Sequence, residues 1–164
     1  MKTLFIGGIK SGKSRSAEAY ILNSTDQLPV YLATSEAVDR EMQEKIERHQ
    51  LQRSERFLTI EEPLNIKQSI EPVTTPILLE CVSMWINNML HYGFKAEDIY
   101  NQIDKIMNMD RDIVFVQNDV SSSIISDNRL VREFIDINGI VSQMITSKCE
   151  SVYHCIAGIS VKIK

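Results

Sequence analysis

The sequence predicts an α/β fold in which a mostly parallel sheet carries helices on both faces. Two observations predict this fold, and a third predicts the number of domains. Short apolar runs alternate along the chain with longer segments whose apolar residues recur at helical spacing. The short runs are apolar at nearly every position, as parallel strands are when both faces of their sheet are buried. No linker and no internal repeat divides the 164 residues, so residues 1–164 are expected to form one domain.

The order of the elements follows from the same patterns. Strands are expected at residues 3–6, 30–33, 77–81, 113–117 and 152–156. Helices are expected at residues 14–22, 37–52, 83–91, 96–109 and 128–146. Residues 57–60 fit one further strand, although four residues do not separate a strand from a loop. Ligands of such sheets bind beyond the carboxyl ends of the strands, so the residues that follow each strand are the candidates for a site.

The composition favours a cytosolic protein that acts on small molecules. A net charge of −4, with acids and bases interspersed, provides no basic stripe for a nucleic acid and no cationic helix for a membrane surface. The apolar runs are far shorter than the roughly 20 residues of a bilayer-spanning helix, and no signal peptide is recognisable. The three cysteines lack the spacing of a zinc or redox site and are expected to be reduced and buried.

A glycine-rich loop directly follows the first strand. It matches the phosphate-binding pattern G-x-x-x-x-G-K-[ST] at every fixed position, with the residues Gly7, Gly8, Ile9, Lys10, Ser11, Gly12, Lys13 and Ser14. Its glycines let backbone N–H groups turn toward a phosphate, and the next helix adds the positive end of its dipole. Lys13 is expected to reach the β- and γ-phosphates, and Ser14 to bind Mg²⁺. The loop predicts nucleoside triphosphate binding but is common to kinases, ATPases, GTPases and transferases.

Two acids follow later strands. Glu80 ends the apolar run 77–79, where a carboxylate would organise a metal or its water shell. The alternative is an ordinary solvated acid at a strand end. Asp119 follows the next strand at the same edge of the sheet. It could serve the same site or cap a loop, and the sequence leaves both interpretations open.

A histidine lies on the apolar stripe of the expected helix 37–52. Val38, Met42, Ile46 and His49 recur there at spacings of four, four and three. His49 is therefore either a core or boundary residue, or an imidazole at the ligand crevice that could attack an α-phosphate. The pattern by itself does not select the second interpretation. His91 and His154 lack metal-ligand spacing to further ligands.

Several further segments point to one family. They are Arg15-Ser16-Ala17-Glu18 after the loop; Tyr31-Leu32-Ala33-Thr34-Ser35; Asp39-Arg40-Glu41-Met42 with Ile46, His49 and Arg53; Thr59, Glu61 and Pro63; Leu79-Glu80-Cys81 with Trp85 and Asn88; Asn128-Arg129-Leu130 with Arg132, Phe134, Asp136 and Gly139; and residues 158–164. In this order they resemble the bifunctional adenosylcobinamide kinase / adenosylcobinamide-phosphate guanylyltransferase family of cobalamin assembly and salvage. The Ala-Thr-Ser strand end, the helix-borne histidine and the Asn-Arg-Leu helix start are the specific parts of the likeness.

The resemblance implies a P-loop NTPase-type, RecA-like sheet and two successive reactions. ATP or GTP would phosphorylate the aminopropanol hydroxyl of adenosylcobinamide, and GTP would then guanylylate His49, which passes GMP to adenosylcobinamide phosphate. Lys13 and His49 would be the catalytic residues, and Ser14 and Glu80 the Mg²⁺ ligands. The family also implies a homotrimer in which one subunit completes its neighbour's site. Beyond the loop, nucleotide contacts are implied for Ala33, Thr34, Ser35, Gln50, Leu51, Gln52, Arg53, Glu61 and Glu80.

The chain departs from the family pattern mainly in one cluster. After the fourth main strand it has serine at positions 121, 123 and 126, where the family has two glycines and a proline. Serine does not share the backbone freedom of glycine. At positions of positive φ or close ligand approach, serine would be strained or would block contact with a corrinoid. Two alternatives to the bifunctional enzyme therefore stand: a small-molecule kinase without guanylyl transfer, and a non-catalytic nucleotide-sensing paralogue. Further departures are Phe57, Ile135 and Ser142.

Overall fold

The fold is described from a computed structural model, in which residues 1–36, 55–120 and 125–164 are described. The expected helix 37–52, with His49 and the implied contacts Gln50, Leu51, Gln52 and Arg53, lies outside these residues. So does most of the serine cluster that departs from the family pattern. Every other predicted element falls within the described ranges.

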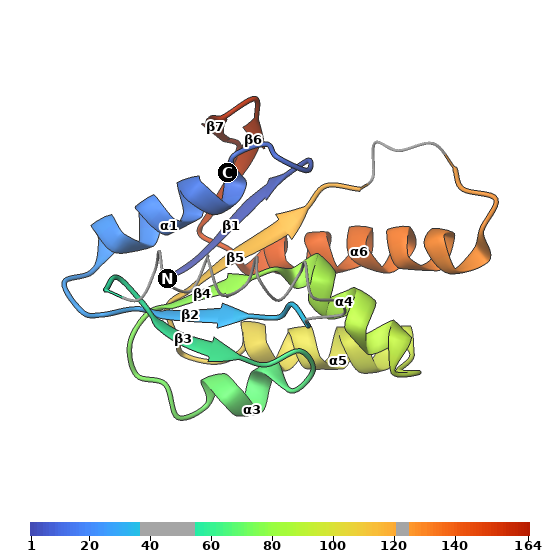
Figure 1. Ribbon diagram of the computed structural model, residues 1–164, viewed down its shortest axis with the longest axis horizontal. Coiled ribbons are helices and arrows are strands. Elements are labelled where there is room, and N and C mark those ends of the chain that lie inside the picture. Colours follow the sequence, from blue (N-terminus) through green and yellow to red (C-terminus); the bar gives the residue numbers. More distant parts are fainter. Residues whose placement is uncertain (37–54, 121–124) are drawn as a thin grey trace.

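The described strands form one sheet in the order β3-β2-β4-β5-β1-β6-β7 (Figure 1). Neighbouring strands are parallel except for the last pair, in which β7 runs antiparallel to β6. The predicted strands, including the short one near residue 58, are found within one residue at each end. Their bounds are β1 Lys2–Gly7, β2 Val30–Ala33, β3 Leu58–Glu61, β4 Ile77–Glu80, β5 Ile113–Asn118, β6 Ser151–Ile156 and β7 Ile159–Lys162.

The described helices lie on both faces of the sheet (Figure 1). Four of them match predicted helices, and the short helix α3 was not predicted. Asn128 caps the longest helix, since its side-chain oxygen accepts the N–H of Leu130 at 2.9 Å. No helix in the described ranges is long and apolar enough to cross a membrane. The bounds are α1 Lys13–Ser24, α3 Ile66–Ile70, α4 Val82–His91, α5 Ala96–Met107 and α6 Arg129–Lys148.

Successive residues of the strands point into two separate hydrophobic cores. Leu4 and Leu79 face the larger core, in which Trp85 of α4 and Ile103 of α5 are fully buried. Phe5, the neighbour of Leu4, faces the smaller core formed with α1. This alternation explains why the strands are apolar at successive positions: both faces are covered, and each buried apolar side chain contributes roughly 1.5–3 kcal/mol.

The strand β7 was not predicted, although its sequence carries a signal. Ile159 and Val161 alternate with Ser160 and Lys162, but all four side chains are exposed because β7 forms an edge of the sheet. It is joined to β6 by a two-residue turn at Ala157 and Gly158, with φ values of 50° and 82°. Turns with positive φ at both positions suit the twist of a tight hairpin.

Candidate active site

Parallel pairing brings the predicted site residues to one edge of the sheet. At the end of β2, Ala33 lies in register with Glu61 of β3 and with Glu80 of β4. At the end of β1, Gly7 lies in register with Asn118 of β5 and Cys155 of β6. Residues that are distant in sequence therefore line the carboxyl edge, where open sheets of this class bind ligands.

The glycine-rich loop connects β1 to α1 at this edge. A Cβ atom at Gly7 would lie 2.3 Å from the carbonyl oxygen of Cys155, so only glycine fits there. Gly12 precedes α1 with a φ of 90°, a conformation that favours glycine. The Lys13 side chain is buried and its Nζ donates to the carbonyl oxygen of Gly8 at 3.2 Å. The Lys13 ammonium group, which is expected to contact phosphate, thus lies against the backbone of the loop.

Ser14 and Glu80 are in direct contact. The Ser14 hydroxyl donates to Oε1 of Glu80 at 2.8 Å, which joins the start of α1 to the end of β4. Hydroxyl and carboxylate oxygens are ligands that Mg²⁺ accepts, usually together with water and substrate phosphate. Among the described residues no cluster of three or more His, Cys, Asp or Glu side chains could hold a metal by itself. The two oxygens of this pair would leave the other positions around a Mg²⁺ ion to water and phosphate.

Cys81 follows Glu80 and is buried against the same edge. Desolvation raises the pKa of the Cys81 thiol, and the negative charge of Glu80 raises it further. The thiol therefore stays protonated at neutral pH. Cys81 is therefore a poor thiolate nucleophile, although it lies next to the candidate metal ligand.

Thr34 holds the end of β2 to the end of β4. Its hydroxyl donates to the Cys81 carbonyl oxygen and accepts the Cys81 N–H, each at 2.9 Å. Its N–H donates to the carbonyl oxygen of Glu80 at 2.9 Å, and its own carbonyl oxygen accepts the Asn88 amide at 2.7 Å. The fully buried Thr34 thus lies at the carboxyl edge of the sheet, with its polar atoms engaged within the protein. Ser35 follows it and is half-buried.

Two side chains of α4 fix the chain beyond β3. Asn88 donates from Nδ2 to the Pro63 carbonyl oxygen at 3.2 Å as well as to Thr34. Trp85 donates from Nε1 to the carbonyl oxygen of Leu64 at 2.9 Å. The ring of Trp85 is fully buried in the core, and these three hydrogen bonds show that α4 also orients the loops after β2 and β3.

A buried polar network that sequence reasoning missed supports the end of β5. The Ser83 hydroxyl donates to Oδ1 of Asn138 at 2.7 Å and accepts the N–H of Asn118 at 3.0 Å. Asn138 donates to the Asn118 carbonyl oxygen at 3.1 Å, and Gln117 donates to the Asn138 carbonyl oxygen at 2.9 Å. The available signal was polar residues within an apolar strand and on the apolar faces of two helices.

The other candidate residues have separate positions. The N–H of Asp119 donates to the Gly7 carbonyl oxygen at 2.9 Å, so its backbone adjoins the phosphate loop. Glu61 is exposed at the end of β3. His91 is exposed at the end of α4, where its ring packs edge-on against Tyr92. His154 is half-buried within β6.

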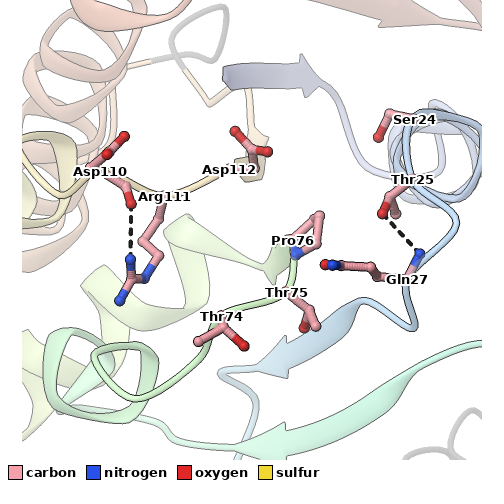
Figure 2. A pocket seen from close by; sticks show the side chains of 9 residues that line it. All are labelled: Ser24, Thr25, Gln27, Thr74, Thr75, Pro76, Asp110, Arg111 and Asp112. Atoms are coloured by element: carbon pink, nitrogen blue, oxygen red, sulfur yellow. Dashed lines mark hydrogen bonds between the residues drawn. The ribbon is translucent and has the colours of Figure 1, made fainter.

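A pocket of about 270 Å³ lies at the amino ends of the strands, on the side of the sheet away from the phosphate loop (Figure 2). It is formed where α1 ends and where β4 and β5 begin. Its lining is almost wholly polar, and Arg111 is held there by the carbonyl oxygens of Asp110 and Glu71 at 3.0 and 3.2 Å. The pocket is thus separate from the phosphate loop. It is lined by Ser24, Thr25, Gln27, Thr74, Thr75, Pro76, Asp110, Arg111 and Asp112.

Comparison with solved structures relates the fold to P-loop ATPases. A KaiC-like protein from Pyrococcus horikoshii OT3 matches with a TM-score of 0.53 at 10% identity, over 93% of this chain and 69% of that one. An ATPase of the type III secretion system of pathogenic bacteria matches with a TM-score of 0.53 at 12% identity, over 98% of this chain and 56% of that one. At these identities the likeness concerns the fold alone, and it confirms the predicted RecA-like architecture.

Sequence comparison finds relatives that match the full length of the chain. The protein is 35% identical to the bifunctional adenosylcobalamin biosynthesis protein CobU of Escherichia coli K12 and 33% identical to CobU of Salmonella typhimurium LT2, with all of both chains covered in each case. It is 28% identical to CobP of Pseudomonas aeruginosa, over 100% of this chain and 98% of that one. Residues 3–163 match the family described as cobinamide kinase / cobinamide phosphate guanyltransferase. The complete phosphate loop and the Ser14–Glu80 contact agree with this end-to-end match. The chain therefore belongs to the cobinamide kinase / cobinamide phosphate guanyltransferase family.

Proposed function

We propose that the protein phosphorylates adenosylcobinamide and then converts the product to adenosylcobinamide-GDP in cobalamin biosynthesis or salvage. The observation that carries the proposal is the Ser14–Glu80 hydrogen bond of 2.8 Å beside a complete phosphate loop, in a chain that matches the bifunctional family over residues 3–163. The contact brings the two candidate Mg²⁺ ligands together. ATP or GTP would serve the first step and GTP the second.

In the kinase step, the aminopropanol hydroxyl oxygen forms a bond to the γ-phosphorus while the bond from that phosphorus to the bridging oxygen breaks. The nucleoside diphosphate leaves, and the hydroxyl proton passes to water. Lys13 would exchange its contact with the Gly8 carbonyl oxygen for the phosphates, where its charge offsets that of the leaving group. A Mg²⁺ ion held by Ser14 and Glu80 would neutralise phosphate charge when bound.

In the guanylyltransferase step, His49 is proposed as the nucleophile. A neutral ring nitrogen would form a bond to the α-phosphorus of GTP as pyrophosphate leaves. A phosphate oxygen of adenosylcobinamide phosphate would then attack that phosphorus and release the histidine. His49 and the flanking Arg53 lie outside the described residues, so this assignment rests on the family resemblance.

The decisive experiment incubates the protein with GTP labelled at the α-phosphate and maps any acid-labile protein–GMP adduct. The parent protein should form the adduct, and His49→Asn should lose both the adduct and guanylyl transfer while it still phosphorylates adenosylcobinamide. Retention of the adduct in a folded His49→Asn protein would place the nucleophile elsewhere. The absence of an adduct in the parent, with phosphorylation intact, would favour a kinase alone, which is one of the two alternatives suggested by the serine cluster after β5.

Homotrimer formation and a cytosolic location belong to the same proposal. The family resemblance supports the trimer, and the three free, buried cysteines agree with a reducing compartment. Light scattering coupled to gel filtration should give a mass three times the 18.8 kDa of one chain. A mass of one chain at micromolar concentration would contradict the trimer.

A further inference from the structure

The turn between β6 and β7 is in contact with the phosphate loop. The N–H of Gly158 donates to the carbonyl oxygen of Ser11 at 2.9 Å. The backbones approach so closely that a Cβ atom on Gly12 would lie 3.1 Å from the Cα of Gly158. The phosphate loop and the C-terminal hairpin are about 146 residues apart in the chain, yet they pack backbone against backbone.

This contact orients one peptide group of the phosphate loop. In a trans peptide the carbonyl oxygen and the following N–H point in opposite directions. Because the Ser11 carbonyl oxygen is held by Gly158, the N–H of Gly12 points away from the hairpin. Ser11 and Gly12 are the last residues before Lys13, so this N–H belongs to the set that a phosphate-binding loop turns toward its anion.

We propose that Gly158 is a positioning residue for nucleotide binding, and that the β6–β7 turn holds the Gly12 N–H in the direction that a bound phosphate requires. The turn thereby spares the loop part of the ordering that phosphate binding would otherwise demand. The inference rests on the proposed function, since it takes the glycine-rich loop to bind nucleotide phosphate. The C-terminal hairpin then takes part in substrate binding and also forms the outer strand of the sheet.

A matched pair of glycine substitutions provides the first test. Gly158 and Gly93 have nearly the same φ, 82° and 83°, so alanine imposes a similar backbone strain at both. A Cβ at Gly93 would meet nothing within 4 Å, and one at Gly158 would meet only Arg15 Nη2 at 3.6 Å, an ordinary contact. The two substitutions thus differ mainly in what the glycine contacts. Because the N–H of Gly158 holds the Ser11 carbonyl oxygen, Gly158→Ala should weaken binding of a fluorescent GTP analogue by roughly tenfold. Gly93→Ala should change this binding by less than about twofold.

The second test removes the hydrogen-bond donor itself and covers the case in which Gly158→Ala does not fold. Residues 155–164 begin with Cys155, so they can be ligated as a synthetic peptide in which the Gly158 amide is an ester. The matched control places the ester at Ile163, whose N–H donates to the Val152 carbonyl oxygen at 2.8 Å in the same hairpin. Each protein then lacks one backbone hydrogen bond donated from this C-terminal segment, and both should lose similar thermal stability.

Nucleotide affinity separates positioning from mere structural support. The ester at Gly158 should raise the Kd for the GTP analogue by roughly tenfold, and the ester at Ile163 by less than about twofold. Equal Kd values for the two esters, with binding intact in the parent, would overturn the inference and leave the proposed function standing. Failure of the parent to bind the analogue, or unchanged binding in Lys13→Ala, would overturn the function and this inference with it.

Discussion

Lys13 is the residue whose loss should matter most to turnover. Its ammonium group is buried within the loop and already contacts the Gly8 carbonyl oxygen. Lys13→Ala should lower both phosphoryl and guanylyl transfer by roughly 10²-fold or more, because a preorganised charge is lost where negative charge develops. Steady-state assays of each half-reaction measure this. Lys67→Ala, which removes an exposed lysine paired with Glu71, should leave both rates unchanged. Full activity in Lys13→Ala would refute the role of the loop.

Glu80 allows the metal hypothesis to be tested by charge alone. Glu80→Gln retains the size of the side chain and an oxygen that can accept the Ser14 hydroxyl, but it loses the negative charge. The Mg²⁺ concentration for half-maximal activity should rise by roughly tenfold, with little change in melting temperature. Glu133→Gln on the exposed side of α6 is the control. Identical Mg²⁺ titrations for the two variants would leave Glu80 as a structural acid.

At the scale of elements, α4 joins the loops that carry several proposed nucleotide contacts. Asn88 donates two hydrogen bonds, to the carbonyl oxygens of Thr34 and Pro63. Asn88→Asp places a carboxylate against two acceptors in a buried position and should lower the free energy of unfolding by roughly 2–4 kcal/mol. The adjacent Asn87 is exposed on the same helix, and Asn87→Asp should change it by less than about 0.5 kcal/mol. Urea denaturation compares the two variants, and equal losses would show that the two Asn88 hydrogen bonds contribute nothing to stability.

At the scale of the whole molecule, burial of Cys149 links stability to alkaline pH. Desolvation raises the pKa of its thiol from 9.0 to about 12. The folded state therefore disfavours the thiolate. The stability that depends on the protonated Cys149 thiol is fully present below pH 9 and is lost as the pH rises from 9 toward 12. The parent's free energy of unfolding should fall in that window by up to about 1.4 kcal/mol per pH unit more than that of Cys149→Ala. Parallel pH profiles would contradict it.

Several parts of the molecule were predictable because their determinants are local. An apolar run followed by the phosphate-binding pattern predicted β1, the loop and α1, and the structure extends them by only one or two residues. The carboxyl-edge rule placed Glu80 near Ser14, and a 2.8 Å hydrogen bond joins them. The helix α3 has only five residues, too few to establish a helical period, and so pattern reasoning passed over it.

What the sequence determined by itself was the class of fold, the phosphate loop and, through the family resemblance, the expected chemistry. These depend on spacing along the chain, which is visible without coordinates. Only the tertiary structure decided three sets of contacts. Thr34 forms hydrogen bonds at the end of β4 and with Asn88, and Ser83 and Asn138 support the end of β5. The N–H of Gly158 holds the Ser11 carbonyl oxygen. Such contacts join residues tens to more than a hundred positions apart. The sheet order creates them, and no local periodicity records which strands become neighbours.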